Sequence, residues 1–141
     1  MIAIVTGCPG QDSYYLVSYL LELDFQVIGT AQYSSTEQAS RFARWDKILS
    51  NPNFKLETLD LIDSNACYSL VEFYKPDHLY NLAAKSHVHY SFRHPESVFQ
   101  INYGGPLRLL DAIHKTSRHT KFYQASTSEL FGSNYSVRAI P

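Results

Sequence analysis

The sequence predicts an α/β fold, a doubly wound parallel sheet with helices on both faces. Short apolar runs rich in β-branched and aromatic residues alternate with amphipathic stretches, which is the pattern of successive β-α-β units. A loop with two glycines joins the first apolar run to the first amphipathic stretch. The five expected strands cover residues 2–5, 25–29, 54–58, 78–82 and 121–124. Right-handed crossovers give 3-2-1-4-5 as the simplest strand order.

Amphipathic patterns predict two helices in the first part of the chain. The helix over residues 11–23 has apolar residues at steps of three and four, and we expect that face to cover the sheet. Its members are Tyr15, Leu16, Tyr19, Leu20 and Leu23. A second helix is expected over residues 36–49, with Phe42, Trp45 and Leu49 on one side. Most aromatic residues are expected to pack in the core or between helices and sheet, including Tyr14, Tyr15, Tyr19, Phe73, Tyr74, Tyr80, Phe122 and Tyr123.

Two more helices are expected in the second part of the chain. Asp63-Ser64-Asn65 is a plausible cap for a helix that runs to Tyr74 and stops before Pro76. A helix over residues 98–113 has its apolar positions at Ile101, Leu109, Leu110 and Ile113. In such folds, ligands bind beyond the carboxyl ends of the strands, so the loops that follow the strands are the place to look for a site.

Length and composition indicate one ordinary domain. The chain has 141 residues, which is enough to bury a core without disulfide or metal staples. Its net charge of -1 provides no basic surface for nucleic acid. Cys8 and Cys67 form no Cys-x-x-Cys pair, and the N-terminus has no apolar segment of the length that a signal peptide or membrane span requires. We therefore expect a cytoplasmic location and no membrane or nucleic-acid partner.

The loop Gly7-Cys8-Pro9-Gly10-Gln11-Asp12 has the position of a phosphate-binding loop. It follows the first strand and opens the first helix, as the dinucleotide loop of a Rossmann-like fold does. Glycine lets the backbone turn and approach a pyrophosphate, and the helix start adds unpaired N–H groups. An ordinary strand-to-helix turn would also use two glycines, but this position favours the binding role. Ser13 stands where a third small residue is expected.

In such a fold, the residue at the end of the second strand determines whether NAD or NADP binds. An acidic residue there holds a ribose 2′-hydroxyl, and an arginine accepts a 2′-phosphate. Thr30-Ala31-Gln32-Tyr33 contains neither residue type. This charge pattern therefore leaves both NAD and NADP open.

His87-x-His89 is the only suggestion of a metal site. The two side chains are expected to alternate along an extended segment and face opposite ways, and no carboxylate or cysteine completes a ligand set. We expect no metal, and we expect His87 to support the loop beside the cofactor.

Four motifs at the strand ends resemble one enzyme family. They are Thr6-Gly7-Cys8-Pro9-Gly10-Gln11-Asp12, Asp60-Leu61, residues 80–88 and residues 122–132. Together these motifs resemble the GDP-mannose 4,6-dehydratases of the extended short-chain dehydrogenase/reductase superfamily. The Gln11-Asp12 ending and the Gln-Ala-Ser-Thr-Ser-Glu-Leu run are the more specific parts. The resemblance implies that residues 1–141 form an NAD(P)-binding domain, truncated after the fifth strand, without the further strands and the segment that binds the sugar nucleotide.

The resemblance also implies roles for individual residues. The pyrophosphate would contact residues 7–12, and the adenine would contact Asp60 and Leu61, although an aspartate at position 60 can equally be a turn or capping residue. The ribose and nicotinamide side would be held by Leu82, Ala83, Ala84, Lys85 and Ser86. Thr127 and Glu129 match the catalytic threonine and glutamate of the family, and an extended chain would place them on the same side.

By resemblance, the reaction converts GDP-mannose to GDP-4-keto-6-deoxymannose by internal hydride transfer and loss of water. The family also uses a Tyr-x-x-x-Lys pair, and none of the eleven tyrosines here is followed by lysine four residues later. NADP is the family's cofactor, but the basic residues that it places after the second strand are absent here, so NADP and NAD both remain candidates. The chain alone is therefore expected to be inactive.

Two alternatives stay open. One is a non-catalytic module that binds a dinucleotide, forms a homo-oligomer or associates with a full-length relative. The other is a related nucleotide-sugar epimerase or dehydratase. GDP-mannose is an expected partner only where the absent segment is supplied.

Overall fold

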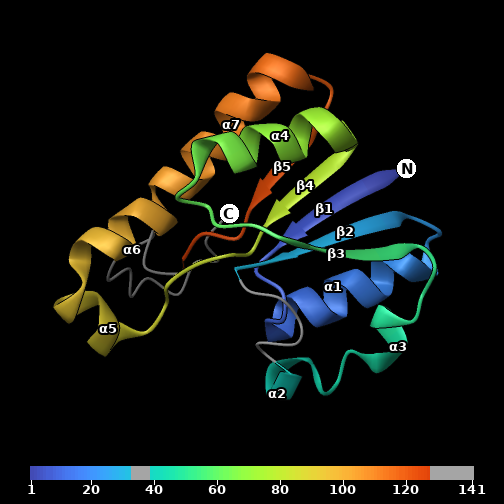
Figure 1. Ribbon diagram of the computed structural model, residues 1–141, viewed down its shortest axis with the longest axis horizontal. Helices are drawn as coiled ribbons and strands as arrows, with labels where there is room; N and C mark the ends of the chain where they lie inside the picture. The colour runs from blue at the N-terminus through green and yellow to red at the C-terminus, as the bar shows by residue number, and fades with distance from the viewer. Residues whose placement is uncertain (33–38, 128–141) are drawn as a thin grey trace, which may run out of the picture.

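The computed structural model describes residues 1–32 and 39–127. Its sheet has five parallel strands, namely β1 (Ile2–Thr6), β2 (Gln26–Ala31), β3 (Phe54–Thr58), β4 (His78–Asn81) and β5 (Lys121–Gln124). The strand order is β3-β2-β1-β4-β5, as predicted, and all five strands lie where the apolar runs place them (Figure 1). Strand β2 continues two residues beyond its predicted end, to Ala31, so that Gln32 follows it directly.

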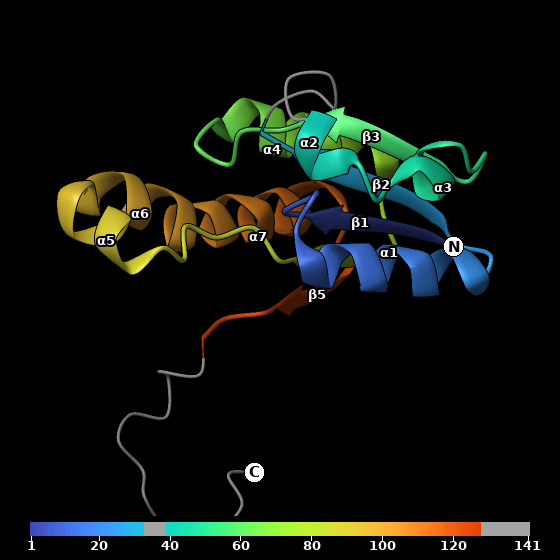
Figure 2. The ribbon, with the colours of Figure 1, turned by 90° about the horizontal axis from the view of Figure 1, so that it is seen from below.

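The helices form layers on the two faces of the sheet (Figures 1 and 2). They are α1 (Gln11–Glu22), α2 (Ala39–Phe42), α3 (Asp46–Leu49), α4 (Ser64–Tyr74), α5 (Val88–Arg93), α6 (Pro95–Asn102) and α7 (Gly104–Thr116). One core packs α1, α2 and α3 against the sheet, and a second core packs α4 and α7 against the opposite face. The central strand β1 contributes Val5 to the first core and Ile4 to the second, because successive side chains of a strand point to opposite faces.

Helix α4 has the predicted cap. The Asp63 carboxylate accepts hydrogen bonds from the backbone N–H groups of Asn65, at 2.8 Å, and Ala66, at 3.0 Å. These two groups lie in the first turn, where no carbonyl of the helix is available to them. The helix ends at Lys75, whose φ of 41° is left-handed, and Pro76 follows. Both ends of α4 are therefore set by local sequence.

The predicted inner face of α1 is correct at Leu16 and Leu20 and wrong at Tyr15, Tyr19 and Leu23. The buried residues of this helix are Ser13, Val17 and Leu20, whereas Tyr15 and Tyr19 are exposed. The rotation of the helix is set at its start, because the Ser13 hydroxyl donates to the Gly10 carbonyl at 2.8 Å and lies 3.2 Å from the Gly7 carbonyl. Ser13 must therefore face the sheet, and the tyrosines turn to solvent.

Two expected long helices are each divided. Residues 39–49 form α2 and α3, with Phe42, Trp45 and Ile48 buried and Leu49 exposed. Residues 98–113 fall in α6 and α7, which meet at Tyr103. Gly104, Gly105 and Pro106 follow that residue, and a proline lacks the N–H group that a continuous helix would need. Gly105 also lets α7 approach closely, since a Cβ there would lie 3.1 Å from Leu61 Cδ1.

Several aromatic residues do not pack in the core as predicted. Tyr14, Tyr74, Tyr80 and Phe122 are partly buried against it, but Phe73 is exposed, like Tyr15 and Tyr19. On the α1 side of the sheet, the Tyr80 and Tyr123 rings lie 6.1 Å apart between centroids. The described helices leave Tyr123 53% exposed. This part of the sheet therefore presents an aromatic surface to solvent.

Two adjacent leucines in α7 test the orientation of that helix. Leu109 is fully buried, whereas Leu110 is 44% exposed, although the sequence pattern places both in the core. We expect Leu109→Ala to lower the free energy of unfolding by about 2–5 kcal/mol, because it removes buried contacts and leaves a cavity. The matched change Leu110→Ala is expected to cost at most about 0.5 kcal/mol. Urea unfolding of both variants measures the difference, and equal losses would contradict this packing.

Candidate functional site

A cavity of about 1000 Å³ lies at the carboxyl ends of the strands. Its walls come from the loop after β1 and from the segments that follow β2, β3 and β4, as the fold predicts. Of the predicted residues, the cavity is lined by Gly7, Cys8, Pro9, Gly10, Asp60, Leu61, Leu82, Ala83, Ala84, Lys85 and Ser86. Sequence reasoning did not select Thr30, Leu59 and Ile101, which also line it. Residues from positions 7 to 101 thus meet in one concave site.

A chain of buried hydrogen bonds holds three strand ends together beneath this cavity. The Thr6 hydroxyl donates to the Asn81 side-chain oxygen at 2.5 Å, and the Asn81 amide donates to the Gln124 side-chain oxygen at 2.7 Å. The Ala83 backbone N–H donates to the Thr6 hydroxyl oxygen at 3.2 Å. Thr6 and Asn81 are completely buried, so these bonds are shielded from water. They fix where the loops after β1, β4 and β5 begin.

Gly7 is required by the turn and by its neighbours. Its φ is 83°, and a Cβ there would lie 2.8 Å from the Ala83 backbone nitrogen. A side chain at this position would therefore meet the protein's own β4 loop before it met any ligand. The Gly10 N–H donates to the Gly7 carbonyl at 2.8 Å, which closes the loop at the start of α1.

Cys8 lies inside the loop but is not a nucleophile. Its backbone N–H donates to the Thr30 carbonyl at 2.9 Å, which ties the loop to the end of β2. Burial raises the pKa of the Cys8 thiol from its ordinary value of 9.0 to about 12. A thiol in this environment stays protonated near neutral pH, and the thiolate is the reactive form. Cys8 therefore has a structural role in shaping the loop.

Gln11 and Asp12 do not line the cavity with their side chains, which are exposed. They form the first turn of α1, directly after the N-cap residue Gly10. Backbone N–H groups in the first turn of a helix have no intrahelical acceptor and carry the positive end of the helix dipole. Any contact of these two residues with an anion would therefore be through the backbone.

Asp60 and Gln32 meet at the ends of β3 and β2. The Gln32 amide nitrogen lies 3.4 Å from one Asp60 carboxylate oxygen, and the other accepts the Ile62 N–H at 3.0 Å. Asp60 therefore has the turn role expected of an aspartate at this position, and that role uses one oxygen of its carboxylate. The other oxygen faces the Gln32 amide, and both residues line the cavity.

The segment after β4 forms the opposite wall. The Lys85 N–H donates to the Asn102 side-chain oxygen at 2.8 Å, and the Asn102 amide donates to the Lys85 carbonyl at 3.1 Å. These two bonds hold the segment against the end of α6. The Lys85 ammonium lies 5.5 Å from the centre of the Tyr90 ring, so it is directed toward α5.

Neither of the two predicted catalytic residues is among the described residues that line the cavity. Glu129 lies outside them, and Thr127 is exposed and is not part of the cavity lining. The expected extended run also breaks, because Ser126 has a left-handed φ of 60°. Alternation along a strand therefore gives no guide to the direction of Thr127.

His87 and His89 are not alternating residues of an extended segment. His87 is the N-cap of α5 and His89 lies in its first turn, with ring centroids 6.1 Å apart. Both line a second hollow of about 560 Å³ beside Lys85 and Arg93. Within residues 1–32 and 39–127, no three histidine, cysteine, aspartate or glutamate side chains gather as metal ligands do. The helices of this same region are too short or too polar to cross a membrane.

The cavity fits an extended dinucleotide. Its volume is at the upper end of the range for small-molecule sites. The first turn of α1 offers backbone N–H groups beside the Gly7–Gly10 turn, and the small residues Ala83 and Ala84 stand at another wall. Polar groups at the β2 and β3 ends complete the far side. Both a diphosphate and a ribose find matching partners among the lining residues.

Fold and site together define a Rossmann-like protein of the NAD(P)-binding type. The family model for GDP-mannose 4,6 dehydratase matches residues 4–139, and the chain belongs to this family. The GDP-mannose 4,6-dehydratase of Yersinia enterocolitica is 44% identical over an alignment of 134 positions, and the match covers 92% of this chain and 36% of the relative. The GDP-mannose 4,6 dehydratase of Homo sapiens is 39% identical over an alignment of 148 positions, and the match covers 99% of this chain and 38% of the relative.

Two solved structures with the same fold are UDP-glucose 4-epimerases. UDP-glucose 4-epimerase of Thermotoga maritima, determined with UDP-glucose, has a TM-score of 0.77 and 26% identity. The match covers 97% of this chain and 41% of the epimerase. UDP-glucose 4-epimerase of Bifidobacterium longum, in complex with NAD+ and UDP, has a TM-score of 0.79 at 20% identity and supports the fold alone. It covers 99% of this chain and 41% of the epimerase. The chain spans little more than a third of the curated relatives that it matches.

Asn81 tests the buried hydrogen-bond chain. We expect Asn81→Ala to lower the free energy of unfolding by about 1–3 kcal/mol, because the Thr6 hydroxyl and the Gln124 side chain lose a partner in a buried place. Asn65→Ala, at an exposed position of α4, is the matched control and is expected to change stability by at most about 0.5 kcal/mol. Urea unfolding of both variants is the measurement. A loss for Asn81→Ala as small as that of the control would show that the bonds are not needed.

Proposed function

We propose that this chain supplies the dinucleotide-binding part of a GDP-mannose 4,6-dehydratase, a lyase that converts GDP-mannose to GDP-4-keto-6-deoxymannose, the first step toward GDP-fucose. One observation carries the proposal. The cavity at the strand ends is bounded by a glycine loop at the start of α1, in a chain 44% identical to a GDP-mannose 4,6-dehydratase. The two buried free thiols fit a reducing, cytoplasmic location.

The cavity residues divide into three groups that match the parts of NAD or NADP. Backbone N–H groups of Gln11 and Asp12, in the first turn of α1, hold the pyrophosphate. Asp60 accepts a hydrogen bond from the adenine amino group, and Leu61 provides apolar contact with the ring. The ribose and nicotinamide side lies against residues 82–86, where Ala83 and Ala84 leave room for it.

Thr127 and Glu129 are the residues proposed for the chemistry. The bound dinucleotide supplies a hydride acceptor for C4 of the hexose and a hydride donor for C6. Thr127 donates a hydrogen bond to the C4 oxygen. Glu129, as a general base, removes the C5 proton, which the C4 ketone makes more acidic, and water leaves across C5 and C6.

Cofactor binding by the chain is the direct test of this function. We expect titration of NADH or NADPH to show saturable binding by a change in nicotinamide fluorescence. Ala84→Leu, at the cavity wall, should weaken that binding at least about tenfold, which corresponds to about 1.4 kcal/mol. Ala43→Leu makes the same change at an exposed position outside the cavity lining and should leave binding unchanged. No binding of either nucleotide would refute the proposal.

The chain by itself is expected to form no product. Its sequence has no Tyr-x-x-x-Lys pair to take the hydroxyl proton during oxidation at C4. Incubation with GDP-mannose and either nicotinamide nucleotide should therefore yield no GDP-4-keto-6-deoxymannose by chromatography. Formation of that product would show that other groups of this chain replace the pair. The coding sequence beyond the codon for Pro141 would show whether such a pair follows.

A second candidate is a module that binds the dinucleotide and associates with another chain without catalysis. The exposed aromatic surface of Tyr80 and Tyr123 on the sheet favours it, since such surfaces often mark contacts with another molecule. A second copy or a longer relative would cover this surface. Sedimentation as a stable monomer, alone and with the longer relative, would exclude this candidate.

A related nucleotide-sugar epimerase or dehydratase is a third candidate. The structural similarity to UDP-glucose 4-epimerases supports the shared fold. Sequence identity of 44% and 39% to two GDP-mannose dehydratases, against 26% to the Thermotoga epimerase, favours the dehydratase.

A further inference from the structure

The end of β2 carries a neutral side chain held beside a carboxylate. Strands β2 and β3 run together to their ends, where the Leu59 N–H donates to the Ala31 carbonyl at 2.8 Å. This pairing brings Gln32 next to Asp60, although the two are 28 residues apart in sequence. Both side chains line the dinucleotide cavity. In Rossmann-like folds, the residue after β2 lies beside the ribose of the adenosine.

Asp60 restricts what the Gln32 amide can offer a ligand. The amide nitrogen faces one Asp60 oxygen at 3.4 Å, while the Ile62 N–H holds the other oxygen at 3.0 Å. A carboxylate accepts hydrogen bonds only, so it selects the nitrogen end of the amide. The amide oxygen of Gln32 and the second N–H of its amide nitrogen are then available to a ligand. That oxygen can accept a hydrogen bond from a hydroxyl and would repel a phosphate.

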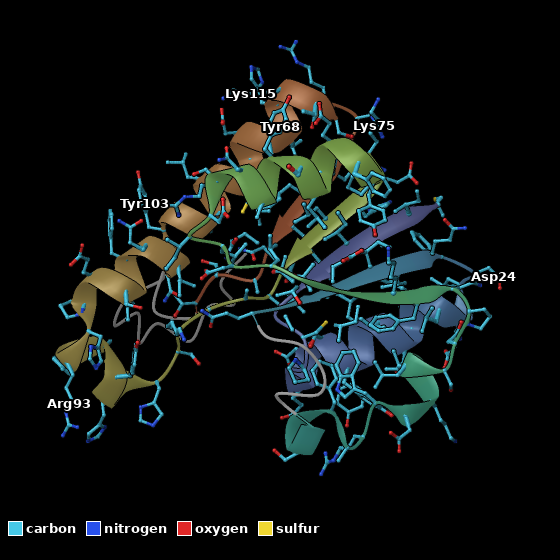
Figure 3. The ribbon with its side chains drawn as sticks, viewed as in Figure 1. Asp24, Tyr68, Lys75, Arg93, Tyr103 and Lys115 are labelled. Carbon is cyan, nitrogen blue, oxygen red and sulfur yellow. The ribbon has the colours of Figure 1, made fainter. Side chains whose placement is uncertain are left out.

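The described cavity lining has no lysine or arginine at the ends of β2 and β3. Among the described lining residues, Lys85 is the single lysine or arginine, and its ammonium is directed toward Tyr90 beside the β4 loop. Figure 3 places Lys75, Arg93 and Lys115 at the outer ends of α4, α5 and α7, away from the carboxyl end of β2. In the sequence, positions 32–40 contain Glu37 and no lysine or arginine, and Arg41 is the first cation after β2.

We infer that Gln32, positioned by Asp60, selects a dinucleotide whose adenosine ribose has a free 2′-hydroxyl, so that this chain binds NAD(H) in preference to NADP(H). A 2′-phosphate carries between one and two negative charges and is bound by arginine or lysine in folds of this kind. Here it would meet the Gln32 amide oxygen and the Asp60 carboxylate. The inference rests on the proposed function, since it concerns the same cavity.

Two ligands that differ only at the 2′ position test the selection. We expect isothermal titration calorimetry to show ADP-ribose binding at least about tenfold more tightly than 2′-phospho-ADP-ribose, a difference of about 1.4 kcal/mol. These ligands contain the adenosine and the pyrophosphate and need no contact at the nicotinamide end. Fluorescence titration with NADH and NADPH should give the same order.

Variants at position 32 and at a matched position separate this role from a general charge effect. Gln32→Arg should tighten binding of 2′-phospho-ADP-ribose at least about tenfold, because an arginine can pair with the phosphate. Gln26→Arg adds the same charge at the opposite, exposed end of β2 and should leave the ratio of the two affinities unchanged. Asp60→Asn keeps an oxygen for the Ile62 N–H but removes the negative charge. This variant should reduce the ratio of the affinity for ADP-ribose to the affinity for 2′-phospho-ADP-ribose.

The outcomes distinguish the inference from the proposed function. Absence of binding to all four nucleotides would overturn both. Equal or tighter binding of 2′-phospho-ADP-ribose by the unchanged chain would overturn the selection by Gln32 and leave the proposed function standing. The same conclusion would follow if Gln32→Arg and Gln26→Arg changed the affinities equally.

Discussion

The hydrogen bonds from Thr6 through Asn81 to Gln124 are the constraint on which the site depends. Parallel strands deliver their loops to one edge of the sheet, but the ladder itself ends where the strands end. At the last paired positions of the ladder, side-chain hydrogen bonds from Thr6 to Asn81 and from Asn81 to Gln124 add a second connection between β1, β4 and β5. The Ala83 N–H also donates to Thr6, so the β4 loop begins beside Gly7, which has no side chain to keep it away. One buried polar chain thus brings two walls of the cavity together.

The strands could be predicted from the sequence because each one is short, apolar and bounded by turn residues. The rotation of each helix about its axis and the breaks between helices were harder to predict from the sequence. In α1, tyrosines and leucines occupy several faces, and the period placed Tyr15 and Tyr19 inward, whereas the Ser13 hydroxyl sets the rotation through the loop carbonyls. In the region of α6 and α7, continuous apolar spacing concealed a break that Gly104, Gly105 and Pro106 impose. Local backbone chemistry, in both places, overrode side-chain periodicity.

In the site as well, features made by consecutive residues could be predicted from the sequence, whereas contacts between distant residues could not. The glycine loop was recognisable because its residues are consecutive and lie between a strand and a helix. The Thr6–Asn81 bond joins positions 75 apart, and Gln32 meets Asp60 only because β3 lies beside β2. Strand order was predictable, and it implies that these strand ends are neighbours. Which side chains meet there depends on where each strand stops, and β2 stops two residues later than its apolar pattern indicates.

The residues that line the described cavity are different from those proposed for the chemistry. Its walls come from segments that follow β1 to β4, whereas Thr127 follows β5 and is not part of the lining. The contacts that choose between dinucleotides lie at the β2 and β3 ends, on the far side of the sheet order from β5. A change at Gln32 therefore alters which cofactor is held without touching the residues proposed for proton transfer.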